Sequence, residues 1–232
     1  MPYLQRDGDV FVLNLGEEGA ADTENRFSPD FLAQVHALLD EVEASTGNAA
    51  LVTTGTGKFY SNGLDLDWLA GHLDQTSSYV GTIQSLFARV LLLPMATVAA
   101  VQGHAFAGGG MLAVAHDEKV MRADRGFFCL PEVDINIPFT PGMAALLQAR
   151  LSKATAHTAM TTGRRYGGAD AAAAGIVDEA VGQEQVLERA MARAQALVGK
   201  RGDTLGAIKQ VMYGPAAAAL TAEATISFDG NA

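Results

Sequence analysis

The chain has 232 residues, 49% of them hydrophobic, so it is long enough for one sizeable core and short for two. Its formal net charge of −10 argues against a surface for nucleic-acid phosphates, which needs a concentrated positive field. The single cysteine, Cys129, cannot form an intramolecular disulfide, and no group of Cys and His has the spacing of zinc ligands. We therefore expect one domain without a metal ion, in a reducing cytoplasm.

Neither end of the sequence matches a targeting signal. Residues 1–10 lack the basic-then-apolar build of a signal peptide, and the apolar stretch 86–115 is broken by Arg89, Pro94 and a glycine run. Residues 228–232 do not match a peroxisomal address of the Ser-Lys-Leu kind. We expect neither secretion nor a membrane-spanning segment.

The first hundred residues alternate between predicted strands and predicted helices. Short apolar runs predict strands at 10–15, 49–54 and 97–101. Apolar residues at helical spacing predict a helix over 28–45, where Ser28 can cap the first turn, and another over 79–93, which Pro94 ends. This alternation predicts an α/β layer fold with crossover connections.

Beyond Pro141 the chain reads as mostly helical. Helical character is found in four segments, 143–151, 154–162, 169–174 and 184–198, and only 175–178 looks extended among them. The alanine-rich stretch 216–219 indicates helix or compositional bias rather than disorder. Amphipathic helices in this half are candidates for contacts between subunits, although such helices also simply cover a sheet.

Two loops follow the last two predicted strands, at the edge where open α/β sheets usually bind ligands. In the second loop, 103–111, three consecutive glycines precede residues that can form a helix, which leaves backbone N–H groups uncovered at the positive end of the helix dipole. In the first loop, 57–66, Gly63 permits a tight turn that could expose the Leu64 amide, and Asp65 can cap a short helix. Together the loops could offer two donors to one anionic oxygen.

These segments resemble those of the enoyl-CoA hydratase/isomerase (crotonase) family. Residues 59–66 resemble its F-x-x-G-x-D-[LI] segment, and 103–110 with Asp117 are similar to its G-x-x-x-G-G-G segment before an aspartate. The similarity extends more loosely over 10–181. It implies an α/β crotonase fold, with a ββα spiral core over 1–180 and a helical C-terminal part of the same domain, over 181–232, that builds homotrimers or hexamers.

The resemblance also implies a substrate and an oxyanion hole. The substrate is an acyl-CoA thioester, so coenzyme A is part of the substrate and no separate cofactor is expected. The backbone amides of Leu64 and Gly108 match the family's oxyanion hole. A preorganised pair of donors lowers the barrier to enolate formation by several kcal/mol, because the negative charge develops on the thioester oxygen.

Two positions decide between the reactions of the family. Hydratases use two glutamates; the first matches Met111, which cannot transfer a proton, and the second matches Glu132. A single base can take a proton from C2 of a 3-enoyl thioester and return it at C4. The chain therefore resembles plant-type Δ3,Δ2-enoyl-CoA isomerases of fatty acid β-oxidation, and we expect apolar neighbours to raise the pKa of Glu132. Asp134 is the reserve acid.

Other candidates for substrate binding lie in or beside these segments: Lys58, Ser61, Asp65, Leu66, Trp68, Phe106, Gly109, Met111 and Ile137. Lys58 could meet a CoA phosphate or be simply solvated, and the apolar residues could line an acyl pocket or belong to the core. His104 is more typical of a structural donor than of a catalytic group. A hydratase with a degenerate site and a non-catalytic acyl-CoA binding homologue remain alternatives.

Overall fold

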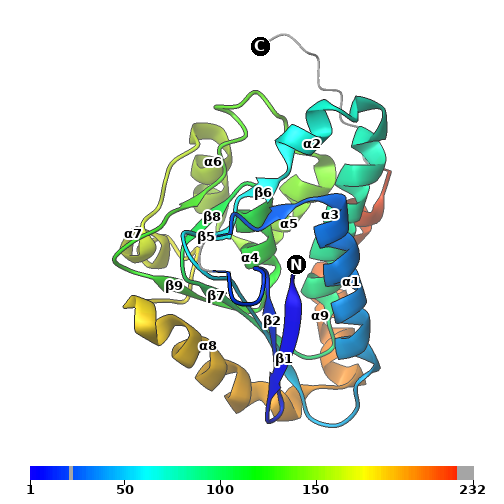
Figure 1. The fold of residues 1–232 in the computed structure, drawn as a ribbon, viewed down its shortest axis with the longest axis vertical. Coiled ribbons are helices and arrows are strands. Elements are labelled where there is room, and N and C mark those ends of the chain that lie inside the picture. Colours follow the sequence, from blue (N-terminus) through cyan, green and yellow to red (C-terminus); the bar gives the residue numbers. More distant parts are fainter. Residues whose placement is uncertain (21–22, 224–232) are drawn as a thin grey trace.

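A six-stranded sheet forms the centre of the computed structural model, which describes residues 1–20 and 23–223 (Figure 1). Its strands, in spatial order, are β1 (Tyr3–Asp7), β2 (Val10–Asn14), β4 (Ala50–Thr54), β7 (Ala96–Val101), β9 (Glu118–Arg122) and β11 (Glu179–Val181). β1 pairs with β2 in antiparallel fashion, and the other neighbouring strands are parallel. Parallel strands need crossover connections, which the helices provide.

A second, smaller sheet contains the parallel strands β5 (Phe59–Ser61), β8 (His104–Phe106) and β10 (Phe128–Cys129). Each of them follows one strand of the main sheet along the chain, and a helix comes after each pair. The chain therefore repeats a ββα unit, which is the spiral core expected of the crotonase fold. A third pairing joins β3 (Arg26–Phe27) to β6 (Gly63–Leu64).

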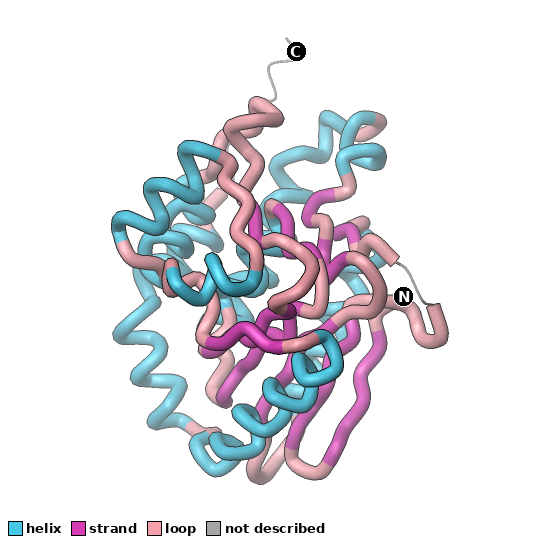
Figure 2. The backbone as a smooth tube through the Cα atoms, turned by 90° about the vertical axis from the view of Figure 1, so that its left-hand side faces the viewer, coloured by secondary structure: helices cyan, strands magenta, loops and turns pink. Residues whose placement is uncertain are grey.

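The helices lie around the strands (Figure 2). They are α1 (Pro29–Ala44), α2 (Leu66–Ala70), α3 (Thr76–Leu92), α4 (Gly108–Ala115), α5 (Pro141–Arg150), α6 (Lys153–Thr162), α7 (Gly168–Ala173), α8 (Gln183–Leu197) and α9 (Asp203–Thr221), with short 3-10 turns at Leu73–Gln75 and Val198–Lys200. Within residues 1–20 and 23–223, no helix is long and apolar enough to cross a bilayer.

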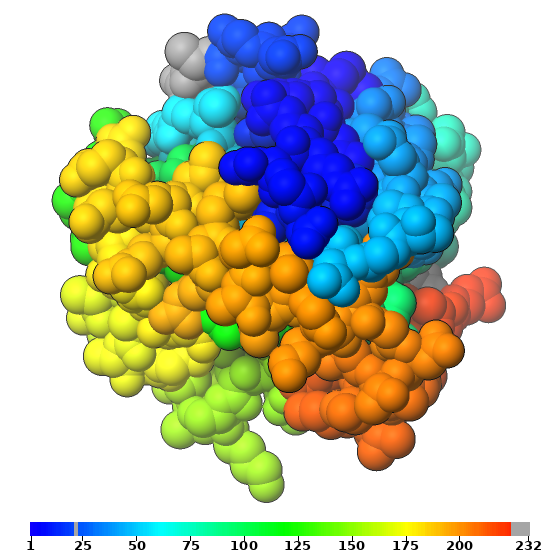
Figure 3. Space-filling model, turned by 90° about the horizontal axis from the view of Figure 1, so that it is seen from below, coloured from blue at the N-terminus to red at the C-terminus, as the bar shows by residue number. Residues whose placement is uncertain are grey.

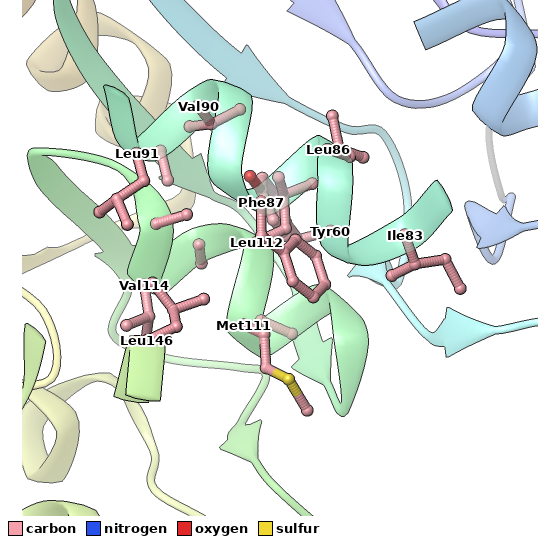
Figure 4. Packing of buried hydrophobic residues seen from close by; sticks show 14 of the residues in the cluster. Tyr60, Ile83, Leu86, Phe87, Val90, Leu91, Met111, Leu112, Val114 and Leu146 are labelled. Carbon is pink, nitrogen blue, oxygen red and sulfur yellow. The ribbon is translucent and has the colours of Figure 1, made fainter. Parts of the chain in front are cut away.

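Two apolar clusters cover the two faces of the main sheet. On one face, α8 lays Val186, Ala190 and Ala194 against alternate strand residues such as Val52 and Val98, and it extends across the molecule in Figure 3. On the other face, α4 is buried along its whole length. Figure 4 shows α3 side chains packed over this helix. Helices therefore cover both faces of the main sheet, α8 on one face and α4 on the other.

The predicted helices are confirmed, with shifts of a few residues at their ends. Ser28 caps α1 as expected, since its side chain accepts a hydrogen bond from the Phe31 amide. The extended segment predicted over 175–178 is wrong. The Ile176 and Val177 amides both bond back to Ala171 O, so the chain turns against α7, and the strand begins at Glu179.

The boundary predicted between residues 180 and 181 falls inside β11, which pairs with β9 over Glu179–Val181. The six-stranded sheet therefore includes one residue from the segment expected to be the helical part. Most of the remaining segment through Thr221 belongs to α8, the 3-10 turn at Val198–Lys200 and α9, and residues 224–232 lie outside the described part of the chain.

Candidate active site

A cavity of about 320 Å³ opens near the N-terminal end of α4. Six residues expected at the site line it, namely Leu64, Leu66, Phe106, Met111, Glu132 and Ile137. Eight further lining residues were not expected: Arg26, Asn62, Asp67, Ala107, Pro131, Ile135, Pro138 and Met143. Most of the wall is apolar, as is usual for a pocket that holds a small-molecule substrate.

The two glycine-containing loops meet at this cavity. Gly63 has a φ of +78°, and a Cβ added there would lie 2.8 Å from the Gly108 nitrogen. A Cβ on Gly109 would overlap the Ser61 carbonyl. Only glycine permits backbones to approach so closely, which explains why the sequence carries glycine at these positions.

Gly108 is the first residue of α4, and its nitrogen lies at this junction. The first N–H groups of a helix have no intrahelical partner and carry the positive end of the dipole. The preceding residue, Ala107, has a φ of 48° and makes no side-chain capping bond. A non-glycine residue in this conformation is strained, and such strain clusters at functional sites. Leu64 follows Gly63 directly, so its amide belongs to the same junction.

Glu132 is the ionisable group that the structure buries in the wall of the cavity. Its side chain is 5% exposed, and one carboxyl oxygen, Oε2, has no hydrogen-bond partner. Burial raises the pKa of Glu132 from 4.5 to about 7, and its own backbone N–H offsets part of that effect. The expectation of a raised pKa is confirmed. This carboxyl can hold or release a proton near neutral pH.

Asp134 points elsewhere. It is exposed, does not line the cavity, and its carboxylate lies against Gly163. The structure therefore corrects the reserve assignment, because this acid is two residues from Glu132 in sequence but outside the cavity.

Ser61 and Gly109 support the cavity from behind and do not line it. The Ser61 side chain is fully buried; its hydroxyl donates to Asn25 O (2.7 Å) and accepts from the Gly63 amide (3.1 Å). With its hydrogen-bonding capacity used inside the protein, Ser61 has little left for a substrate. Gly109 contributes by its lack of a side chain.

Three other expected binding residues lie outside the lining. Asp65 caps α2 by accepting from the Trp68 amide (3.2 Å), as its position predicted. Trp68 stacks on His72, with ring centroids 4.3 Å apart. Lys58 lies in the wall of a separate polar cavity. Trp68 therefore does not line this cavity as an acyl-pocket residue would, and Lys58, expected to meet a CoA phosphate or to be solvated, lies apart from it.

His104 has the structural role that was expected. Its Nδ1 accepts a hydrogen bond from the Phe127 amide (3.2 Å), and its ring packs against Phe59 and Phe106. Burial and nearby cations lower its pKa. Within residues 1–20 and 23–223, no group of three or more His, Cys, Asp or Glu side chains could hold a metal ion.

The unexpected lining residues come from distant parts of the sequence. Arg26 reaches the mouth from β3, where it pairs with Glu24 and Asp67. Met143 comes from the first turn of α5, which Thr140 caps. Apolar or basic residues at such positions carry no local signal of a site, because only the packing of α5 and the β3–β6 pairing bring them there.

The sequence and fold both match known proteins. The enoyl-CoA hydratase/isomerase family model matches residues 20–229. Enoyl-CoA delta isomerase 3 of Arabidopsis thaliana is 37% identical over 223 residues, covering 92% of each chain. Enoyl-CoA delta isomerase 2, peroxisomal, of the same plant is 34% identical, again covering 92% of each.

Two solved structures have the same fold. The probable enoyl-CoA hydratase of Mycobacterium tuberculosis has a TM-score of 0.86 and 26% identity, covering 96% of this chain and 92% of the other. Human mitochondrial delta3-delta2-enoyl-CoA isomerase has a TM-score of 0.85 and 24% identity, covering 94% and 85%. The chain belongs to the enoyl-CoA hydratase/isomerase family and has the crotonase fold.

Proposed function

We propose that this protein is a Δ3,Δ2-enoyl-CoA isomerase with Glu132 as its proton shuttle. The observation that carries the proposal is a single unpaired carboxyl in an apolar wall, with Met111 where a second acid would be needed for hydration. The other charged lining residues, Arg26 and Asp67, form an ion pair with each other. The similarity to isomerases of Arabidopsis thaliana supports the same choice.

The reaction follows from these groups. The Glu132 carboxylate takes a proton from C2 of a 3-enoyl thioester, and the electron pair moves onto the thioester oxygen. The amides of Leu64 and Gly108 donate hydrogen bonds to the resulting dienolate, stabilising charge that is absent from the substrate. Protonated Glu132 then delivers the proton to C4, which leaves the double bond between C2 and C3. The carboxylate is regenerated.

The raised pKa suits both halves of this cycle. A carboxyl with a pKa of about 7 is a stronger base than an ordinary glutamate and is still half ionised near neutral pH. Met111 and Phe106 make the surroundings apolar. Neither side chain can activate a water molecule for addition to the double bond.

A two-substrate assay tests the proposal. The purified protein is given a 3-enoyl-CoA and, separately, a 2-enoyl-CoA, and both products are quantified. We expect isomerisation of the first and negligible hydration of the second. Hydration without isomerisation would establish the hydratase alternative, whereas tight acyl-CoA binding with neither product would establish a non-catalytic binding protein.

We also propose a homotrimer, or a hexamer built from two trimers. Helix α9 presents Ile208, Val211 and Met212 to solvent, with 50%, 84% and 58% of their surfaces exposed. A contiguous apolar surface of this kind is typical of an interface between subunits. Light scattering would give the mass, and a monomer at micromolar concentration would contradict the proposal.

A cytoplasmic location is proposed as well. The free Cys129 is buried, which is compatible with a reducing compartment. Two relatives are described as peroxisomal, so cell fractionation should test both compartments.

A further inference from the structure

Asn25 holds the first site loop from beneath. It is 5% exposed and has a φ of 51°, a left-handed conformation that Asn adopts more readily than most residues. Its Nδ2 donates to two consecutive carbonyls of β5, Phe59 O at 3.1 Å and Tyr60 O at 3.0 Å. Its own carbonyl accepts from the Ser61 hydroxyl at 2.7 Å. One side chain and one carbonyl therefore fasten three successive residues of the strand.

The Ser61 hydroxyl connects Asn25 to the turn at Gly63 by hydrogen bonds. The hydroxyl that donates to Asn25 accepts from the Gly63 amide at 3.1 Å, which uses the N–H immediately before Leu64. Gly63 in turn lies against the Gly108 nitrogen, and the Gly109 Cα packs on the Ser61 carbonyl. The hydrogen bonds thus lead from Asn25 to the junction of the two loops.

We propose that Asn25 and Ser61 are positioning residues for the oxyanion hole. This inference rests on the proposed function, since it assigns these residues to the amides that would hold the thioester oxygen. Neither side chain lines the cavity, so neither touches the substrate. They act by fixing the Gly63–Leu64 peptide relative to Gly108. A donor displaced by about 1 Å can reduce a rate by roughly 100-fold.

A substitution at Ser61 removes the link while leaving the cavity wall intact. In Ser61→Ala, the Gly63 amide loses its acceptor and the Asn25 carbonyl loses its donor. Asn25→Gly removes the side-chain hydrogen bonds to β5, and glycine still tolerates the positive φ. This variant therefore measures the effect of losing the side-chain amide without forcing a change in backbone conformation. Ser61→Cys retains a weak donor and acceptor and should be intermediate.

The test uses a saturated acyl-CoA labelled with ¹³C at the thioester carbonyl, which binds but cannot isomerise. Infrared difference spectroscopy of the complex reports how strongly the carbonyl oxygen is hydrogen-bonded. We expect a shift to lower frequency in the wild-type complex, a smaller shift in Ser61→Ala and Asn25→Gly, and acyl-CoA affinity within about 3-fold of wild type. We expect kcat to fall roughly 10- to 100-fold in the same variants.

Thr54→Val is the matched control, because it also removes a buried hydroxyl bonded to a backbone carbonyl, that of Ala100, but has no link to Gly63. It should keep wild-type kcat and carbonyl frequency. Unchanged carbonyl frequency and kcat in both Ser61→Ala and Asn25→Gly would overturn the inference and leave the proposed function standing. The inference would also be overturned if these variants lost acyl-CoA affinity to the same extent as Thr54→Val. A wild-type complex without any frequency shift would instead contradict the proposed oxyanion hole itself.

Discussion

The two ends of helix α4 differ in whether the polar groups near them have hydrogen-bond partners. At the N-terminal end, the helix begins without a side-chain cap, and the nearby Glu132 leaves one carboxyl oxygen without a partner. At the C-terminal end, His116 is fully buried but bonded at both ring nitrogens, to Leu112 O (2.8 Å) and to Thr53 Oγ1 (2.9 Å).

Two cationic side chains, Arg150 and Lys209, supply further hydrogen bonds at the C-terminal end. Arg150 donates to carbonyls at this end, including Val114 O at 3.2 Å, where the helix dipole favours positive charge. Lys209 reaches in from α9 to pair with Asp117 at 2.7 Å and to donate to Met95 O. The comparison shows that the buried polar side chains at the C-terminal end of α4 are paired within the protein, whereas the Glu132 carboxyl at the cavity keeps one oxygen that a ligand could meet.

The largest expected effect comes from removing the unpaired carboxyl. Glu132→Gln keeps the shape of the side chain but cannot accept the C2 proton, so kcat for a 3-enoyl-CoA should fall about 1,000-fold or more. Acyl-CoA affinity should stay within a few-fold. Asp134→Asn is the control, and it should retain activity because its carboxylate lies outside the cavity. An inactive Asp134→Asn with an active Glu132→Gln would reverse the assignment.

The paired end of the helix should respond in stability instead. Lys209→Met leaves the partly exposed Asp117 without its buried partner and should lower the free energy of unfolding by about 3 kcal/mol. Urea denaturation measures the change. Lys200→Met, on an exposed residue, should change it by less than about 0.5 kcal/mol. Equal effects of the two substitutions would show that the buried pair is unimportant.

Removing the Glu132 carboxyl should also stabilise the fold in a pH-dependent way. The pKa of Glu132 is about 7 in the folded protein and near 4.5 in the unfolded chain, so its ionisation opposes folding as pH rises through this window. Glu132→Gln should therefore be more stable than wild type by about 3 kcal/mol at pH 8, with the gap nearly gone by pH 4.5. A constant gap, measured by urea denaturation, would contradict the raised pKa.

His116 should give the opposite slope. Burial lowers its pKa from 6.5 to about 4, so the unfolded chain binds the extra proton and stability falls as pH drops below 6.5. In the Glu132→Gln background, we expect a loss of about 2 kcal/mol between pH 6.5 and 5. Adding His116→Gln should flatten that slope. An unchanged slope in the double variant would assign the loss to other groups.

Sequence reasoning predicted α1, α3 and the helices from α5 to α8, and it missed the shortest strands and most of α9. The pattern over 28–45 predicted α1, because a cap, a proline and spaced apolar residues agree there. Strands such as β5 and β10 have only three and two residues, too few for an alternating pattern to show. Helix α9 was recognised only in its alanine-rich end, since it carries Pro215 and Lys209 at positions that only tertiary packing explains.

The site divides in the same way. The placement of Glu132 and Leu64 at the cavity, and of Gly108 at the junction of the two loops, could be predicted because the glycines and the acid leave a local trace in the sequence. Arg26 and Met143 could not, since their place at the cavity depends on how β3 and α5 pack against distant elements. Asn25 was missed because its role arises from bonds to a strand some 35 residues away.

The most direct test of the single-base account follows one hydrogen. A 3-enoyl-CoA carrying two deuterium atoms at C2 is converted in ordinary water under single-turnover conditions, and the product is examined by mass spectrometry and NMR. Because the same buried Glu132 carboxyl takes and returns the hydrogen, we predict deuterium at C4 of the 2-enoyl product in a substantial fraction of molecules. A C4 hydrogen drawn entirely from solvent would contradict the account, because the buried carboxyl would then not carry the hydrogen from C2 to C4.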